Sequence, residues 1–378
     1  MKQKRLGGLC AAAIFLLCAL MTGFYLIAGY GAYLDSDMAS ELALASHLAK
    51  EGALISSTWA YSTEVRVLST QLVFTPLMAL FPYDWRLVRT LGCLILQGIL
   101  AASAYFCGRA LGADKKFSLL FAGLSISACS VVYAQMVTIG AYYVPHAVLT
   151  NLCVGMTARL MRMEKGKKRA ALGALLLAMS AAITALSFVL LEGLYLNRYW
   201  IPLMTLGAPV MAACLTGETN APLRRGCALL FAGVVLTASA MQITSTMKHP
   251  EITDVQRERA AFLQESGLTF GYATFWNANV ITELTNGEVE AVGISIAQNE
   301  KGQGVPRVSE WLEAQENRRM ERPDERVFML LTEAESERLD DFLKKSGAQA
   351  RCTRDGMTAY EIESQRIFFE TAQAMDTP

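Results

Sequence analysis

The N-terminal part of the chain contains 25 consecutive residues without a charge: LGGLCAAAIFLLCALMTGFYLIAGY, residues 6–30. A helix needs roughly 20 such residues to cross about 30 Å of bilayer hydrocarbon. The run is too long to be the apolar core of a signal peptide. It therefore predicts a retained helix that anchors the chain in a membrane.

Further apolar runs follow over the first two thirds of the chain. They cover residues 87–111, 117–137, 143–160, 170–191, 200–215 and 227–243. Hydrophobic residues make up 53% of the chain and charged residues 18%, a balance that is rare in water-soluble domains. The sequence therefore predicts an α-helical polytopic membrane protein with about seven spans.

Lysine and arginine are concentrated in every second loop between these runs. The basic positions are Lys2, Lys4, Arg5, Lys115, Lys116, Arg159, Arg162, Lys165, Lys167, Lys168, Arg169, Arg224 and Arg225. Basic loops remain on the cytoplasmic side. The pattern predicts a plasma-membrane protein with a cytoplasmic N-terminus and an extracytoplasmic C-terminus. The net charge of zero gives no indication of a nucleic-acid partner.

Two domains are expected on this topology. Residues 1–243 would form the transmembrane domain, with an external loop at 31–85 that carries helices along the membrane surface. Residues 244–378 would form an extracytoplasmic α/β domain, because helical and strand patterns alternate there. Its expected helices are 254–266, 275–284 and 333–345, and its expected strands are 269–273, 289–296, 327–331 and 358–362. Cys352 is the one cysteine of this domain, which excludes a disulfide within it.

An acidic motif, YLDSDMASE at residues 33–41, opens the external loop. Asp35 and Asp37 are two residues apart, and such a pair can bind a divalent cation (Mg²⁺ or Mn²⁺) or accept a proton as a general base. The same spacing equally fits a helix N-terminus with Ser36 or Asp37 as the N-cap. Local spacing by itself favours the N-cap.

Aromatic and basic residues accompany the motif. The loop holds Trp59, Tyr61 and Arg66, and the second apolar run begins with DWRLVR at residues 84–89. Aromatic rings can stack on sugars. Tryptophan and arginine also anchor helices at a membrane interface, and for the 84–89 segment this alternative stays open.

The order of these features resembles the GT-C superfamily of membrane glycosyltransferases, which includes protein O-mannosyltransferases and the aminoarabinose transferases of lipid A. The resemblance is carried by the first apolar run, the acidic motif after it, and the segment from WRLVR (85–89) to CGRALG (107–112). NRYWIP at 197–202 is similar to a segment that opens a late span in bacterial members. An external α/β domain after the last span also fits.

The resemblance implies transfer of a sugar from a polyprenyl-phosphate donor to a glycan, lipid or protein acceptor at the outer face of the bilayer. Asp37 would be the general base, and Asp35 its partner or a ligand of the divalent cation. Arg198 would bind the lipid phosphate. The implied substrate-binding residues are Arg66, Arg89, Arg198, Tyr199, Trp59 and Tyr61.

The chain departs from this family in two ways. Members usually have more membrane spans, whereas about seven are expected in this chain. Met38 follows Asp37, where many members have a second acidic residue. A non-catalytic relative whose external domain binds a partner or a glycan is therefore the main alternative. A transporter is disfavoured, because the runs hold few charges and no inverted repeat is recognisable.

Overall fold

The computed structural model describes residues 2–61, 69–141, 143–160, 171, 174–176, 178–179, 201–248, 251–354 and 356–376. The chain divides into two units. The apolar unit comprises Met1–Tyr30, Leu68–Thr70 and Thr90–His249, and the α/β unit comprises Gly31–Val67, Gln71–Arg89 and Pro250–Pro378. Each unit is described by itself.

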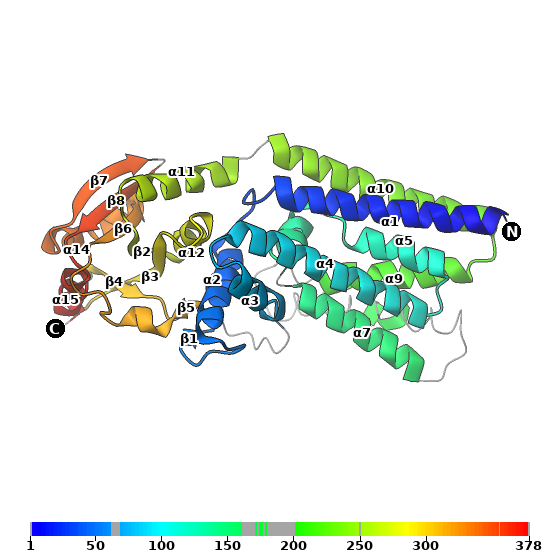
Figure 1. The fold of residues 1–378 in the computed structure, drawn as a ribbon, viewed down its shortest axis with the longest axis horizontal. Coiled ribbons are helices and arrows are strands. Elements are labelled where there is room, and N and C mark those ends of the chain that lie inside the picture. Colours follow the sequence, from blue (N-terminus) through cyan, green and yellow to red (C-terminus); the bar gives the residue numbers. More distant parts are fainter. Residues whose placement is uncertain are drawn as a thin grey trace. The chain divides into compact units, whose positions relative to one another are not determined.

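The apolar unit is helical (Figure 1). Its helices are α1 (Lys2–Ala28), α4 (Trp85–Ala110, which begins in the α/β unit), α5 (Lys115–Ser125), α6 (Val131–Tyr133), the π-helix η1 (Ala134–Ile139), α7 (Val144–Leu160), α9 (Ile201–Gly217) and α10 (Ala221–Lys248). Helix α1 packs against α5 and α10, and α9 packs against α5 and α7.

Three described helices are long and apolar enough to cross a membrane. They are Leu6–Ala28, Trp85–Ala110 and Ala221–Lys248. The pair Val131–Ile139 and Val144–Leu160, bent by 86°, would add a fourth if it formed one span. The described residues thus give three candidate spans, and the count of about seven stays a prediction. Most of the expected run 170–191 lies outside the described residues.

The expected span 117–137 is not one continuous helix. Helix α5 has 11 residues, or about 16 Å, which is too short to span. Three serines lie at the break, and their hydroxyls form hydrogen bonds with the backbone there. Ser125 and Ser127 donate to the carbonyl oxygens of Ala122 and Gly123, and Ser130 caps the next helix.

The α/β unit contains a six-stranded sheet in the order β4-β3-β2-β6-β8-β7. The strands are β2 (Phe270–Thr274), β3 (Glu290–Gln298), β4 (Gly304–Val308), β6 (Val327–Thr332), β7 (Gln349–Arg354) and β8 (Met357–Ile362). Strand β2 runs parallel to β3 and β6, whereas the other pairs are antiparallel. The helices are α11 (Glu251–Glu265), α12 (Phe275–Leu284), α13 (Glu333–Arg338), α14 (Asp340–Lys345) and α15 (Gln365–Asp376). A C-terminal sheet domain was the prediction, and it is confirmed.

Both faces of the sheet are covered, because successive side chains of a strand point to opposite faces. Along β6, Val327, Met329 and Leu331 belong to the core against α14 and α15. Phe328 and Leu330 belong to the core against α11 and α12. This explains the unbroken apolar sequence of the strand.

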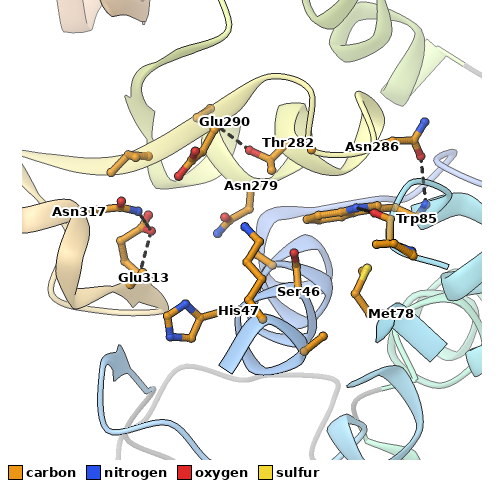
Figure 2. A pocket seen from close by; sticks show the side chains of 18 of the residues that line it. Ser46, His47, Met78, Trp85, Asn279, Thr282, Asn286, Glu290, Glu313 and Asn317 are labelled. Carbon is orange, nitrogen blue, oxygen red and sulfur yellow. Dashed lines mark hydrogen bonds between the residues drawn. The ribbon is translucent and has the colours of Figure 1, made fainter. Parts of the chain in front are cut away.

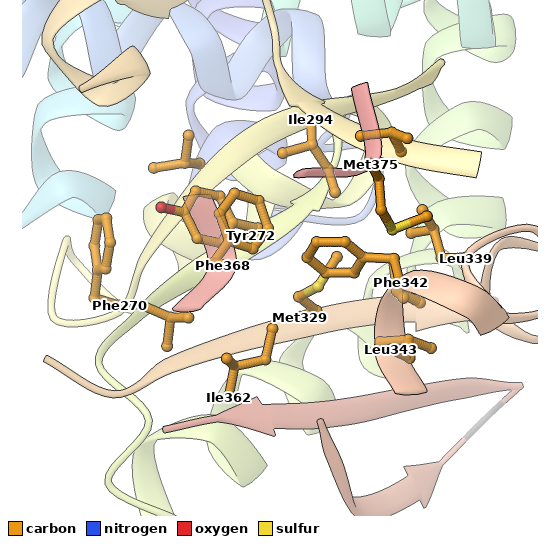
Figure 3. Packing of buried hydrophobic residues seen from close by; sticks show 14 residues of the cluster. Phe270, Tyr272, Ile294, Met329, Leu339, Phe342, Leu343, Ile362, Phe368 and Met375 are labelled. Atoms are coloured by element: carbon orange, nitrogen blue, oxygen red, sulfur yellow. The ribbon is translucent and has the colours of Figure 1, made fainter. Parts of the chain in front are cut away.

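Aromatic rings fill the core beside α14 and α15 (Figure 3). The rings of Tyr272 and Phe368 are stacked with their centroids 3.9 Å apart and their planes at 8°, and Phe342 meets Phe368 edge-on. On the opposite face, β2 approaches β6 closely. A Cβ at Gly271 would lie 2.3 Å from the carbonyl oxygen of Phe328, so this position requires glycine.

Several elements differ from expectation, and the helix α15 and the short strand β5 (Glu313–Ala314) were not predicted. The edge strands β4 and β7 were not predicted, and β4 contains Pro306, which an edge strand tolerates because one side of its backbone is unpaired. The expected helix 333–345 is divided at Leu339 into α13 and α14.

The predicted domain boundary is corrected by the loop 31–85, which belongs to the same unit as the C-terminal residues. It forms α2 (Ser36–Glu51), α3 (Gln71–Leu80) and β1 (Trp59–Ala60). Helix α2 packs against α3 and α12, and β1 pairs with β5 (Glu313–Ala314). The loop thus contains helices, as predicted, and ten residues of α2 are buried. A position of these helices along a membrane surface stays a prediction.

Replacing Phe368 by alanine is expected to destabilise the α/β unit by about 3–5 kcal/mol, because the ring is 1% exposed and its removal leaves a cavity. Thermal and denaturant unfolding of the purified protein measure this. Arg366→Ala, on the exposed side of the same helix, is the control and should cost less than about 1 kcal/mol. Equal effects of the two substitutions would contradict the packing described.

Candidate functional site

The acidic motif forms the beginning of α2. Asp35 is the N-cap: its backbone is extended, at φ −116° and ψ 174°, and its side chain accepts a hydrogen bond of 2.9 Å from the Met38 amide. The sequence suggested Ser36 or Asp37 for this role, so the cap is one residue earlier than expected. The helix ends at Gly52, whose φ of 66° suits glycine.

The two carboxylates of the motif have different environments. Asp37 is half-buried in the first turn of α2, where the partial positive charge of the helix N-terminus favours its negative charge. Burial raises the pKa of the Asp35 carboxyl, while the Met38 amide and the charge of Arg89 partly oppose that rise. A carboxylate with a raised pKa is a better proton acceptor near neutral pH.

Arg89 holds the first turn of α2 through hydrogen bonds. Its Nε and Nη2 donate to Oε1 and Oε2 of Glu283 at 2.5 and 2.7 Å, and Nη2 donates to the Met38 carbonyl oxygen at 2.8 Å. Arg89 is 1% exposed and Glu283 is completely buried. The forked geometry that a phosphate would need is occupied by Glu283. Arg89 therefore joins α12 to the first turn of α2.

A second polar contact holds α3 to α2. The Gln71 side-chain amide donates to the backbone oxygen of Glu41 at 2.9 Å and to its carboxylate at 3.0 Å. Thr75 donates to the Gln71 side-chain oxygen at 3.2 Å. All three residues are buried, so their hydrogen bonds set the register between the two helices.

Two other predicted site residues, Trp59 and Tyr61, lie in or next to β1. Trp59 is buried in β1, and Tyr61 is exposed, with its hydroxyl accepting a hydrogen bond from the Ser56 amide. Arg66, Arg198 and Tyr199 lie outside the described residues.

The donor set for a divalent cation is small. Among the described residues, no three histidine, cysteine, aspartate or glutamate side chains could hold one metal ion together. Asp35 and Asp37 would therefore supply two carboxylates at most, and the remaining ligands would have to be water or substrate oxygens.

The α/β unit contains a pocket of about 670 Å³ (Figure 2). It is lined by α2, β1, the segment from α3 to the start of α4, α12, β3 and β5. His47, Trp59, Trp85, Asn279 and Glu313 are among the lining residues. The volume lies within the about 300–1,000 Å³ typical of ligand pockets.

Glu313 lies at the inner wall of this pocket. Its carboxylate accepts hydrogen bonds from the Gly293 amide at 2.7 Å, the Asn317 side-chain amide at 2.9 Å and the Ala314 amide at 3.1 Å. Burial nevertheless raises its pKa to about 7. Glu313 thus changes charge near neutral pH, inside the pocket.

His47, a residue of α2, also lines the pocket. Its Nε2 lies 2.9 Å from the Thr58 hydroxyl and 3.2 Å from Glu51, and its Nδ1 lies 3.6 Å from Glu316. The imidazole ring also packs against Trp59, with centroids 5.5 Å apart. These contacts hold β1 against α2 and shape one side of the pocket.

The sequence interpretation missed the residues that α12 and β5 supply. Asn279 and Glu283 are four residues apart in the segment FWNANVITEL, so they share one helix face. A glutamate in this mostly apolar helix was a usable signal. Glu313 had none, because β5 is two residues long and its partner is distant in sequence.

Comparisons of the chain with known protein families, with curated proteins and with solved structures find no match. The family resemblance described above therefore stays a prediction.

Removing either partner of the buried ion pair is expected to destabilise the α/β unit by about 3–5 kcal/mol, because the remaining charge is left buried. The variants are Arg89→Met and Glu283→Leu, assayed by denaturant unfolding. The double variant should be more stable than either single variant, since it leaves no buried charge without a partner. Single variants within about 1 kcal/mol of wild type would contradict this role.

The raised pKa of Glu313 predicts a pH-dependent stability. Its pKa rises from 4.5 to about 7 on folding, so the folded state holds the proton more tightly. The stabilisation, about 3 kcal/mol, is complete below pH about 4.5 and is lost as the pH rises through about 7.

Glu313→Gln should remove this component, so its melting temperature should fall less than that of wild type between pH 5 and pH 7.5. Glu310→Gln is the control, because its carboxylate is 86% exposed. Parallel curves for Glu313→Gln and wild type would show that the carboxyl is not perturbed.

Proposed function

We propose that the chain is a GT-C-like glycosyltransferase, which moves a sugar from a polyprenyl-phosphate donor to a glycan, lipid or protein acceptor. The observation that carries the proposal is the position of Asp35 and Asp37. They begin a packed helix directly after a helix that is long and apolar enough to span a membrane. Carboxylates that follow the end of a membrane-spanning helix would lie near the membrane surface, where a lipid-linked substrate can reach them.

The proposed reaction uses Asp37 as the general base. The acceptor hydroxyl loses its proton to the carboxylate while its oxygen bonds to the anomeric carbon of the sugar. The bond from that carbon to the phosphate oxygen breaks, and the electron pair leaves with the polyprenyl phosphate. Asp35, whose pKa is raised by burial, would share the proton with Asp37. We assign no step to a divalent cation.

The developing charge on the phosphate requires a cation. We propose Arg198 for this role, with Arg66 as the second choice and Tyr199 beside the donor. Arg89 is instead proposed as a positioning residue, because Glu283 and the Met38 carbonyl already accept its hydrogen bonds. It would hold the first turn of α2 in place.

An extracytoplasmic location is part of the proposal. The segments 31–67 and 71–89 and the segment 250–378 belong to one unit, so they must lie on the same side of a membrane. The number of crossings between residues 90 and 249 would then be even. Together with α1 this agrees with an odd total and with the alternation of basic loops, which favours a cytoplasmic N-terminus.

A non-catalytic binding protein is the second candidate. It is favoured by the structural use of the motif: Asp35 caps α2, and Arg89 is bonded to Glu283. In that case the pocket of the α/β unit would be the functional site, and Asp37 would have no part in chemistry.

A transfer assay in proteoliposomes separates the two candidates. Wild-type protein is incubated with a panel of polyprenyl-phosphate sugars, and the sugar released from the lipid or joined to an acceptor is measured. Asp37→Asn should reduce the rate by about 10²-fold or more, because the base is lost. Asp324→Asn, on the exposed surface of the same unit, is the matched control and should leave the rate unchanged.

Wild-type protein that transfers no sugar from any donor would favour the binding protein. Equal rates for wild type and Asp37→Asn would remove Asp37 as the base.

A further inference from the structure

Two residues that line the pocket of the α/β unit carry a buried hydrogen-bond donor without a partner. Trp59 and Asn279 are each 5% exposed, and neither the indole Nε1 nor the amide Nδ2 has a hydrogen-bond acceptor among the described residues. In Figure 2 the Asn279 side chain reaches into the middle of the pocket, between Glu313 and Trp85. Buried donors are normally paired. Because these two belong to residues of the pocket lining, a ligand that brings acceptor oxygens would satisfy them.

The charge of the lining restricts what that ligand can be. Four glutamates line the pocket, against one lysine and one histidine: Glu288, Glu290, Glu313, Glu316, Lys50 and His47. Glu290 is paired with Arg322 at 2.6 Å, and Glu313, with a pKa of about 7, is only partly charged near neutral pH. The remaining carboxylates, of Glu288 and Glu316, accept hydrogen bonds and repel anions. A phosphate or a carboxylate group would satisfy the two donors but would face this acidic lining.

The remaining lining is apolar or aromatic. Trp85 lines the pocket and donates from its Nε1 to the Pro82 carbonyl oxygen, and Met78 and Ala79 are further apolar lining residues. Tyr83 is 87% exposed, and it lines the pocket. Apolar faces, two donors and several acceptors match a molecule that has C–H faces and hydroxyl groups together.

We propose that this pocket binds an uncharged saccharide, as the acceptor-side recognition site of the transferase. Its hydroxyl oxygens accept from Trp59 Nε1 and Asn279 Nδ2, and its hydroxyl protons are donated to the glutamate carboxylates. The acceptor assignment rests on the proposed function, whereas saccharide binding by the pocket does not.

The pocket and the acidic motif use different parts of the same helix. Ala43, Ser46, His47 and Lys50 line the pocket from one face of α2. Asp37 precedes Ala43 by six residues, which is about 9 Å along the helix axis. At 100° per residue, Asp37 also lies about 120° around the helix from Ala43. An acceptor held in the pocket and deprotonated at Asp37 must therefore extend past one sugar ring and around α2, so the proposal specifies an oligosaccharide.

Binding of neutral oligosaccharides to the full-length protein in nanodiscs tests the proposal. A glycan array containing uncharged and uronic-acid oligosaccharides identifies the ligand, and calorimetry then measures its affinity without any polyprenyl donor. We expect binding of one or more uncharged di- or trisaccharides and at least tenfold weaker binding of the matched anionic ones.

Asn279→Leu is the critical variant, because it removes the unpaired donor and keeps the branched shape of the side chain. It should weaken saccharide binding about tenfold and leave the melting temperature unchanged or higher, since no hydrogen bond of Nδ2 is lost. Trp276→Phe, an exposed aromatic outside the pocket lining, is the control and should bind like wild type.

The outcomes for the pocket and for transfer are independent. Absence of binding to every uncharged oligosaccharide, preference for the anionic ones, or full affinity of Asn279→Leu would overturn the saccharide site even if sugar transfer is observed. Normal binding by Asp37→Asn together with its loss of transfer supports both proposals. Binding without transfer by wild type keeps the site and rejects the transferase.

Discussion

The ion pair between Arg89 and Glu283 is the contact on which the arrangement of the α/β unit depends. The two residues are 194 positions apart in the chain. A charge pair without solvent is stable only when its hydrogen bonds are complete, and here the carboxylate accepts two bonds while the Met38 carbonyl oxygen accepts a third. The ion pair and the third hydrogen bond thereby hold together α2, the start of α4 and α12, which are far apart in sequence.

This contact gives α2 its functional geometry. The helix starts at the acidic motif, where Arg89 reaches Met38, and continues beneath the pocket that α12 and β5 complete. A rigid helix fixed at its first turn keeps both ends at a constant separation. The proposed proton acceptor and the proposed saccharide site are therefore linked by one element, which suits a reaction on an extended acceptor.

Polar groups in the pocket have two different uses. Glu313 is bonded to three donors and shapes the wall, even though burial raises its pKa to about 7. Asn279 and Trp59 keep donors that no described residue accepts. A fold retains such groups at little benefit to its own stability, which is the usual mark of a binding surface.

The sequence alone determined the three long apolar helices α1, α4 and α10, the acidic motif and most of the α/β elements, because hydrophobic runs and 3.6- or 2-residue periods are local properties. Segment 275–284 was predicted with the limits of α12. Tertiary structure alone decided that Asp35 caps α2, that Arg89 is bonded to Glu283, and that the loop 31–85 joins the C-terminal unit. These depend on pairing between distant residues, and no local pattern specifies which buried charge meets which partner.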